Sequence, residues 1–312
     1  MPTFLVTTAT GRQGASTARI LLAQGHKIHA LVRDSTSPAS LDLQSVGAIL
    51  FKGDFADVAA INAALQGVDG VFLNTVPNLQ DPNSEIRATE TFVAAARATG
   101  TVNSFVVSTV FRTDEQEDWS KLKDDGFPFI SAYYSSKAGV ERVIRASGFA
   151  YTILRPGWLM HNYIGSATKY HFPGYRTERV MTVSVPRDHK LDHFDAADVG
   201  KFAAAALLEP GRYRGKEIDL VNEWLTFEEV ARHLSDAIGA EVKVRYRTPE
   251  ETAEAKKKSP SVEKQAYAAD GYEKSRPDVS GITAGYGFPL STFKEFLKRE
   301  TSEIRKTVGI DA

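Results

Sequence analysis

The chain of 312 residues contains no cysteine, which excludes disulfide bonds, thiolate metal sites and cysteine nucleophiles. It also lacks an apolar run of about 18 residues, the length at which a transmembrane helix becomes a candidate. The amino terminus has none of the positive charge that begins a signal peptide. We therefore expect no membrane segment and a cytoplasmic address, or a nuclear one if the protein is a regulator.

An excess of charge of either sign is missing as well. The 38 Lys and Arg residues stand against 39 Asp and Glu residues, which leaves a net charge of -1. A general nucleic-acid binder normally carries a basic excess, so we expect no direct contact with nucleic acid. With 42% hydrophobic and 25% charged residues, the composition is that of an ordinary globular protein. The oligomeric state stays open.

Apolar segments of strand length alternate with helical segments through the first half of the chain. Strands are expected near residues 3–8, 27–33, 47–54, 68–75, 104–110 and 150–157. Between them, helices are expected at 15–25, 59–67, 84–100 and 131–148, each ended by a glycine or a serine–glycine pair. Apolar strands separated by amphipathic helices indicate an α/β fold with a parallel sheet covered on both faces.

The second half is less regular. Residues 158–190 look like loops, and 249–285 look like a solvated, mobile helix or loop, with a nucleic-acid patch at its lysines as the alternative. A later helix begins with Thr226 as its N-cap and Glu229 three residues on, which is the spacing of a capping box. A helix over 289–309 is expected near the end of the chain.

A glycine-containing turn joins the first strand to the first helix, where the phosphate-binding turn of a dinucleotide site must lie. Gly11 permits the sharp turn, and Gly14 lets the backbone approach a pyrophosphate that lies on the helix amino terminus. Thr17 takes the third position of the pattern. We expect Gly14→Val to abolish NADP binding and to leave the fold intact. The alternative is a turn that merely links strand and helix. The residues assigned to cofactor binding here are Thr10, Gly11, Arg12, Gln13 and Gly14.

The end of the second strand bears on the choice of cofactor. Arg33 follows that strand and can bind the 2′-phosphate of NADP through a planar, bidentate contact. Arg12 adds a second cation at the same end of the site. Asp34 keeps NAD open, because an acidic residue in this region binds the ribose of NAD. NADP(H) is the expected cofactor, and a solvated cation at a strand end is the alternative for Arg33.

The ends of the third and fourth strands supply further candidates for the cofactor site. Asp54 and Phe55 could border the adenine, although Asp54 could equally be a helix N-cap. Asn74 and Thr75 should face the cofactor from the carboxyl edge of the sheet.

Six segments, taken in order, resemble the NmrA-like family of atypical short-chain dehydrogenases. They are TATGRQG, ALVRD, FKGDFAD, SSKAGVE, YTILRPG and DAADVGKFAAAAL, and the resemblance spans residues 3–245. It implies a Rossmann-type sheet, NADP(H) binding and a smaller C-terminal substrate lobe, and it places the turn at Pro156 beside the nicotinamide. Members of this family include reductases of small metabolites and regulators that bind dinucleotide without turnover.

We accordingly predict an α/β, Rossmann-type doubly wound parallel sheet with a smaller substrate-binding lobe. The NADP-binding domain is expected over residues 1–157, with parts returning at about 191–222. The lobe is expected over 158–312.

Tyr133 and Lys137 lie four residues apart on an expected helix, so both side chains share one face. This is the Tyr-x-x-x-Lys arrangement of catalytic short-chain dehydrogenases. The phenol would act as a general acid, and the ammonium would lower its pKa and hold the nicotinamide ribose. Ser108 or Thr109, at the end of the fifth strand, could donate a hydrogen bond to the substrate oxygen. The alternative for Tyr133 is an aromatic in the wall of a pocket.

Apolar and aromatic side chains follow the sixth strand. Trp158, Met160, His161 and Tyr163 could line a mostly apolar substrate pocket, and packing within the lobe is the alternative. His and Asp residues gather at 189–198, but their spacing matches no metal motif, so no metal is expected.

The function expected from these features is NADPH-dependent reduction of a carbonyl, imine or activated alkene. The substrate would be a small, apolar or aromatic metabolite. The alternative is a non-enzymatic NADP(H) sensor that contacts a protein partner. The sequence does not identify the substrate.

Overall fold

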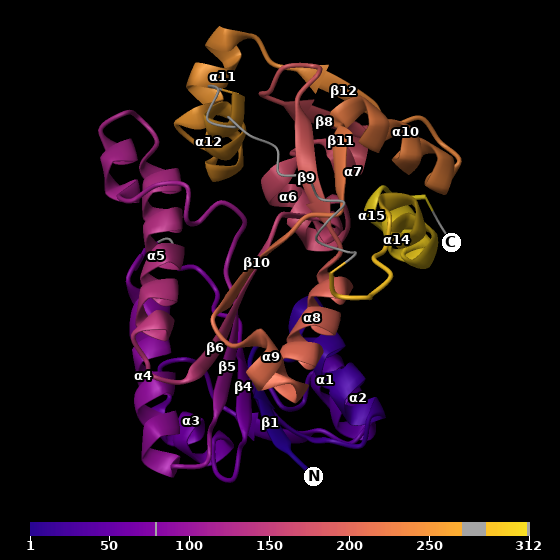
Figure 1. Ribbon diagram of the computed structural model, residues 1–312. Coiled ribbons are helices and arrows are strands. Elements are labelled where there is room, and N and C mark those ends of the chain that lie inside the picture. Colours follow the sequence, from indigo (N-terminus) through magenta and orange to yellow (C-terminus); the bar gives the residue numbers. More distant parts are fainter. Residues whose placement is uncertain (79, 270–284, 311–312) are drawn as a thin grey trace. The chain divides into compact units, whose positions relative to one another are not determined.

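The computed structural model describes residues 1–78, 80–269 and 285–310 (Figure 1). The chain forms two compact units. Unit 1 comprises residues 1–118, 132–156 and 196–220. Unit 2 comprises 119–131, 157–195 and 221–312. The segment 119–131 differs from the expected division, because it lies within the predicted first domain but belongs to unit 2.

A seven-stranded parallel sheet forms the centre of unit 1 and confirms the predicted fold class (Figure 1). Its order is β10-β6-β5-β4-β1-β2-β3, so the chain moves outward in both directions from β1 and β4. In such sheets ligands bind outside the carboxyl ends of the strands at the point where the order reverses. The strands are β1 Thr3–Val6, β2 Lys27–Val32, β3 Ile49–Lys52, β4 Gly70–Leu73, β5 Ser104–Ser108, β6 Ala150–Pro156 and β10 Lys216–Leu220.

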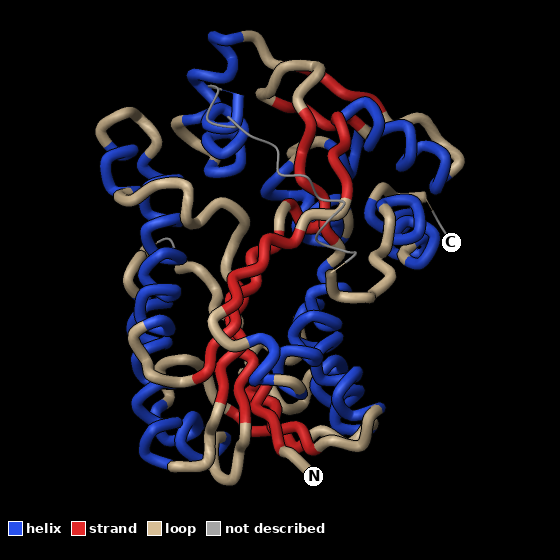
Figure 2. The backbone as a smooth tube through the Cα atoms, viewed as in Figure 1, coloured by secondary structure: helices blue, strands red, loops and turns tan. Residues whose placement is uncertain are grey.

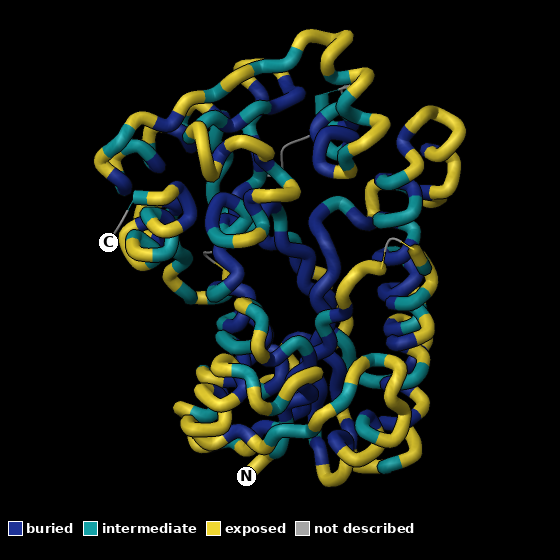
Figure 3. Tube along the Cα trace, turned by 180° about the vertical axis from the view of Figure 1, so that it is seen from behind, coloured by how far each residue is buried: buried dark blue, intermediate teal, exposed yellow. Residues whose placement is uncertain are grey.

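Helices cover both faces of this sheet, as its apolar strands require (Figure 2). Helices α3, α4 and α5 lie on one face, and α1 and α8 lie on the other (Figure 1). The central strands β1, β4 and β5 are almost wholly buried, and the interior of the unit is dark in the burial view (Figure 3). The helices are α1 Arg12–Ala23, α2 Pro38–Ser45, α3 Val58–Ala64, α4 Ser84–Thr99, α5 Pro128–Arg145, α8 Ala196–Leu208 and α9 Pro210–Tyr213.

Helix α2 is absent from the sequence-based expectations, although its start carries local signals. The side chain of Ser37 caps the helix by accepting a hydrogen bond from the backbone N–H of Ser40. Pro38 occupies the first turn, where its missing N–H costs nothing. The helix is short and weakly amphipathic, which explains why the apolar pattern did not reveal it.

Unit 2 combines two small sheets with short helices. A three-stranded sheet has the order β11-β9-β7, and a separate pair joins β12 to β8. The strands are β7 Trp158–Leu159, β8 Val180–Val183, β9 Lys190–Phe194, β11 Glu223–Thr226 and β12 Lys243–Tyr246. The α-helices are α6 Thr168–His171, α7 Tyr175–Glu178, α10 Phe227–Ile238, α11 Pro249–Lys256, α12 Pro260–Tyr267, α14 Phe293–Arg299 and α15 Thr301–Thr307. In the described part of unit 2, short 3₁₀ helices cover Trp119–Lys123, Met160–Tyr163 and Gly165–Ala167.

The predicted capping box at the start of α10 is confirmed, since Thr226 and Glu229 bond each other's backbone N–H. The expectation of loops over 158–190 is wrong, because that segment contributes strands and short helices to unit 2. Segment 249–285 begins with α11 and α12, and its residues 270–284 lie outside the described part of the chain. The predicted last helix is divided at Glu300 into α14 and α15.

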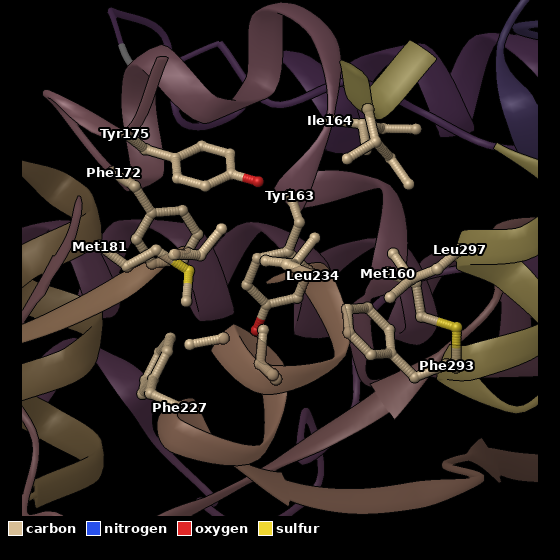
Figure 4. Packing of buried hydrophobic residues seen from close by; sticks show 14 of the residues in the cluster. Met160, Tyr163, Ile164, Phe172, Tyr175, Met181, Phe227, Leu234, Phe293 and Leu297 are labelled. Carbon is tan, nitrogen blue, oxygen red and sulfur yellow. The ribbon is translucent and has the colours of Figure 1, made fainter. Parts of the chain in front are cut away.

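A dense aromatic core holds unit 2 together (Figure 4). The rings of Tyr163 and Phe172 stack with their centroids 5.4 Å apart. Burying rings of this size stabilises a small lobe whose secondary-structure elements are short. No helix among the described residues is both long and apolar enough to cross a membrane.

Candidate functional site

The turn after β1 departs from the geometry that its glycines suggested. Thr8 has a φ of +49°, a left-handed conformation that favours glycine and is rare for a β-branched residue. Its hydroxyl donates a hydrogen bond to the carbonyl oxygen of Asn74, just beyond β4. The turn therefore has its three key positions, each three residues apart, at Thr8, Gly11 and Gly14. From the sequence, these positions were expected at Gly11, Gly14 and Thr17. The first position was missed because it holds a threonine instead of a glycine.

Gly14 has a packing role besides the contact with pyrophosphate that was expected of it. A Cβ built on Gly14 would lie 2.4 Å from the carbonyl oxygen of Thr8 and 2.9 Å from the Cα of Ala9. Both atoms belong to the backbone of the turn and cannot move aside cheaply. Gly14 therefore permits the close packing of helix α1 against the turn, and the expectation that Gly14→Val leaves the fold intact is wrong.

The strain at Thr8 can be measured by comparing two variants that both lose the hydroxyl. In regular structure glycine is less stable than alanine by about 0.5–1 kcal/mol. At a left-handed position the order should reverse, so we expect Thr8→Gly to be more stable than Thr8→Ala by about 1 kcal/mol. Urea unfolding of both variants measures the difference. A more stable alanine variant would show that position 8 is unstrained in solution.

A cavity of about 160 Å³ opens at the carboxyl edge of the sheet in unit 1. It draws residues from the loops after four strands, which is where a dinucleotide binds in this type of fold. Phe55 and the exposed Val76 give it apolar surface, whereas Arg33 and Asp54 give it charge. Its lining residues are Thr8, Thr10, Leu31, Val32, Arg33, Gly53, Asp54, Phe55 and Val76. The cavity brings together the four sequence candidates Thr10, Arg33, Asp54 and Phe55.

The two charged residues after β2 are held differently. Arg33 is exposed at the cavity and forms no ion pair with any described residue. Asp34 instead closes a local turn, in which its carboxylate accepts bonds from the backbone N–H and the hydroxyl of Thr36 at 2.9 and 2.6 Å. These hydrogen bonds hold the pKa of Asp34 below its usual value. The local turn explains an aspartate at this position without a role in binding ribose.

Asp54 is not the N-cap of the following helix. That role belongs to Asp57, whose carboxylate accepts the backbone N–H of Ala60 at 2.9 Å. Asp54 accepts the N–H of Ala56 at 2.8 Å and lines the cavity. Arg12, in the first turn of α1, is exposed and is not among the residues that line the cavity.

The structure separates the two hydroxyls at the end of β5. Ser108 donates a hydrogen bond of 2.7 Å to the amide oxygen of Gln13, at the start of α1. Thr109 donates one of 2.7 Å to Glu141, which is also bonded by the buried guanidinium of Arg155 at 3.0 and 2.8 Å. The hydroxyl of Thr109 therefore belongs to a buried ion network. Ser108 remains the candidate to contact a substrate. It lies beside Gln13, which is a candidate for cofactor binding.

Tyr133 and Lys137 lie on α5, as the spacing predicted, and a third residue joins them. The ammonium of Lys137 pairs with the carboxylate of Glu85 at 2.6 Å, and both side chains are buried. The Lys137 Nζ lies 5.8 Å from the centroid of the Tyr133 ring. Thr75, a cofactor candidate, donates its hydroxyl to the same Glu85 oxygen at 2.6 Å. Sequence reasoning missed Glu85 because it lies 52 positions before Lys137 and belongs to no local motif.

The expected direction of the Tyr133 pKa is wrong. Burial raises the pKa of Tyr133 above its ordinary value of 10, and the charge of Glu85 raises it further. The lysine was expected to lower it, but its charge is balanced by the adjacent carboxylate. A phenol is already protonated at neutral pH, and the raised pKa extends this to more alkaline pH, which suits a proton donor.

The four residues expected to line a substrate pocket lie in unit 2 and differ in how far they are buried. Met160 and Tyr163 have no exposed surface and pack in the aromatic core shown in Figure 4. The Tyr163 hydroxyl lies 2.9 Å from Nε2 of His193. This burial favours the packing role that was the alternative for both residues. Trp158 is also nearly buried, and His161 is the most exposed of the four.

Pro156, the last candidate for the cofactor site, ends strand β6. Its carbonyl accepts the backbone N–H of Phe111 at 3.0 Å. In the described part of the chain, no group of three or more His, Asp or Glu side chains is arranged to hold a metal ion. Burial lowers the pKa of His193 to about 4, so its imidazole is neutral at pH 7.

Comparison with known proteins assigns this arrangement to a family. The model of the NmrA-like family matches residues 2–267. The chain belongs to the NmrA-like family. The resemblance noted over residues 3–245 is therefore confirmed, and the match extends through α12.

Curated relatives of this NmrA-like chain include reductases. It is 28% identical over 300 residues to an NAD(P)H azoreductase of Xenophilus azovorans, covering 94% of this chain and 96% of that protein. It is 30% identical over 236 residues to a (4-alkanoyl-5-oxo-2,5-dihydrofuran-3-yl)methyl phosphate reductase of Streptomyces griseus, covering 75% and 73%.

Solved structures with the same fold include enzymes and a regulator. An Escherichia coli NADPH-dependent quinone oxidoreductase complexed with NADPH matches with a TM-score of 0.71 and 22% identity, covering 95% of this chain and 99% of that one. NmrA, a negative transcriptional regulator in complex with NAD, matches with a TM-score of 0.73 and 20% identity, covering 99% and 98%. At these identities the likeness establishes the shared fold only.

Proposed function

We propose that this NmrA-like protein is an NADPH-dependent oxidoreductase that reduces a carbonyl, imine or activated alkene of a small, apolar or aromatic metabolite. The observation that carries the proposal is the placement of Tyr133 and Lys137 one turn apart on α5, with the Lys137 Nζ 5.8 Å from the centroid of the Tyr133 ring. They belong to the same unit as the cavity that Arg33 lines. The reductases among its curated relatives support the reaction class.

The residues at the carboxyl edge of the sheet fit NADP. The exposed guanidinium of Arg33 can bind the dianionic 2′-phosphate through a bidentate contact. Phe55 and Val76 offer apolar surface to the adenine, and the carboxylate of Asp54 can accept a ribose hydroxyl. The amino terminus of α1, which begins at Arg12, favours the negative pyrophosphate. When bound, the cofactor supplies a hydride to the substrate.

The chain's own residues would then complete the reduction. The Tyr133 hydroxyl gives its proton to the anion that forms on the substrate, and a proton from water restores the phenol. Lys137 keeps one N–H on Glu85 and can direct its others to the nicotinamide ribose. Ser108 can donate to the substrate oxygen in place of its bond to Gln13.

The choice of cofactor depends on Arg33. A charged hydrogen-bonded contact to phosphate is worth roughly 1.5–3 kcal/mol. We therefore expect Arg33→Ala to weaken NADPH binding about ten- to a hundredfold and to leave NADH binding nearly unchanged. Calorimetric titration with both nucleotides measures this.

Arg19→Ala is the matched control for charge. Arg19 lies on α1 and pairs with the exposed Asp42 instead of lining the cavity. Its removal changes the net charge equally and should leave both affinities near those of the parent protein. An equal loss of NADPH and NADH affinity in Arg33→Ala would show that Arg33 supports structure and does not recognise the phosphate.

A non-enzymatic NADP(H) sensor is the second candidate, because a negative transcriptional regulator in complex with NAD has the same fold. A sensor would bind NADPH tightly, oxidise none of it with quinones, azo dyes, ketones or enones, and retain a protein partner in a nucleotide-dependent way. NADPH oxidation with any of these substrates at a rate that depends on Tyr133 would decide for the enzyme.

A further inference from the structure

Glu85 is a buried carboxylate to which the function proposed above assigns no role of its own. It lies in the first turn of α4 and is 2% exposed. Its Oε1 accepts the ammonium of Lys137 and the hydroxyl of Thr75, both at 2.6 Å. Its Oε2 accepts the hydroxyl of Ser136 at 2.9 Å. Donors from α5 and from the segment after β4 therefore converge on one acidic side chain.

Such convergence fixes the position of the lysine. A buried charge is tolerated only when it is paired and hydrogen-bonded, and here both partners meet that condition. A lysine has four flexible bonds, so the contact with Glu85 is what restricts where the Lys137 ammonium can lie. The position of α4 therefore determines the position of a group on α5.

The same carboxylate controls the charge beside Tyr133. The phenol lies one helical turn before Lys137, whose Nζ is 5.8 Å from the centre of its ring. An isolated ammonium at this place would stabilise the phenolate, but the Lys137–Glu85 pair is neutral overall. Among the described residues, the titratable groups that the structure places together here include Glu85, Lys137, Tyr133 and Tyr134, whose ring packs edge-to-face on that of Tyr133. The hydroxyls of Thr75 and Ser136 bond the carboxylate.

We propose that Glu85 is a positioning residue that holds the Lys137 ammonium in place and keeps the Tyr133 phenol protonated. The proposal rests on the reductase function, in which Tyr133 donates a proton. A site that retains this phenol serves reduction over a wide range of pH. Oxidation of an alcohol would need the phenolate as the base, and Glu85 opposes its formation.

The test measures proton loss without cofactor or substrate. The full chain is labelled with ¹³C at tyrosine Cζ and lysine Cε, and its spectra are followed with rising pH. Tyr133→Phe and Lys137→Met assign the two signals. In Glu85→Gln, the midpoint of the first deprotonation step of Tyr133 and Lys137, taken together, should lie about one to three pH units below that of the parent protein. A carboxamide keeps the shape of the side chain and removes its charge.

A second comparison covers the case in which Glu85→Gln leaves a buried lysine unpaired and fails to fold. Lys137→Met is compared with the double variant Glu85→Gln/Lys137→Met, in which both charges are absent. Without the carboxylate, the ionisation constant of Tyr133 should rise at least tenfold. Ser136→Ala removes one hydrogen bond but keeps the charge, so its titration should stay close to that of the parent protein.

The outcomes are distinct. Equal Tyr133 midpoints in the two lysine-free variants would overturn the proposal and leave Glu85 as a link between α4 and α5. A lowered midpoint supports it, and because neither NADPH nor substrate is present, this result does not depend on finding turnover. Failure of the proposed function would appear separately, as absent NADPH oxidation by the parent protein.

Discussion

Replacing Tyr133 with phenylalanine should lower the rate of substrate reduction by about 10²–10⁴, the usual contribution of a general acid. The substitution removes one hydroxyl and keeps the ring that packs edge-to-face against Tyr134. The affinity for NADPH and the melting temperature should therefore change little. NADPH oxidation, followed by absorbance with a panel of quinones, azo compounds, ketones and enones, gives the rate.

Tyr134→Phe is the matched control for this experiment. It removes a hydroxyl from the adjacent residue of the same helix, whose side chain is buried. Its reduction rate should stay within a few-fold of the parent protein. Because burial and Glu85 raise the pKa of Tyr133, the reduction rate of the parent protein should also show no decline from loss of the Tyr133 proton up to about pH 10, the ordinary pKa of a tyrosine. Full activity of Tyr133→Phe would mean that water or the substrate supplies the proton.

Gly14→Ala should destabilise unit 1 by about 3 kcal/mol, the upper end of the usual cost of overpacking, since the added Cβ meets backbone atoms that cannot yield. The nearest of them, the carbonyl oxygen of Thr8, would be 2.4 Å away. A loss of this size is a large fraction of the roughly 5–15 kcal/mol that stabilises a typical protein. It should lower the melting temperature by roughly 6–12 °C, and any loss of NADPH affinity would follow from the displaced turn.

Gly11→Ala provides the comparison, because it lies in the same turn with more room. Its Cβ would lie 3.2 Å from the carbonyl oxygen of Thr8, so small shifts can accommodate it. We expect it to melt much closer to the parent protein. If Gly14→Ala melts as high as Gly11→Ala, the close packing of α1 on the turn does not require a glycine.

The sequence by itself determined the features that are local along the chain. Apolar strands alternate with amphipathic helices, and this order led to the parallel sheet of unit 1. The positions of Gly11 and Gly14 located the turn between β1 and α1. The four-residue spacing of Tyr133 and Lys137 placed both on one helix, because helical periodicity depends only on neighbouring residues. The family was recognisable from motifs of the same local kind.

Only the tertiary structure decided how distant residues meet. Thr8 and Asn74 become neighbours because β1 and β4 are adjacent in the sheet, and no pattern around Thr8 reveals its left-handed backbone. The packing of α4 and α5 on the same face brings Glu85 to Lys137, which reverses the expected direction of the Tyr133 pKa. The short helices and strands of 158–190 likewise depend on burial in a shared core, since elements of a few residues are unstable alone. Contacts between residues far apart in the chain follow from strand order and side-chain packing, which spacing along the sequence does not encode.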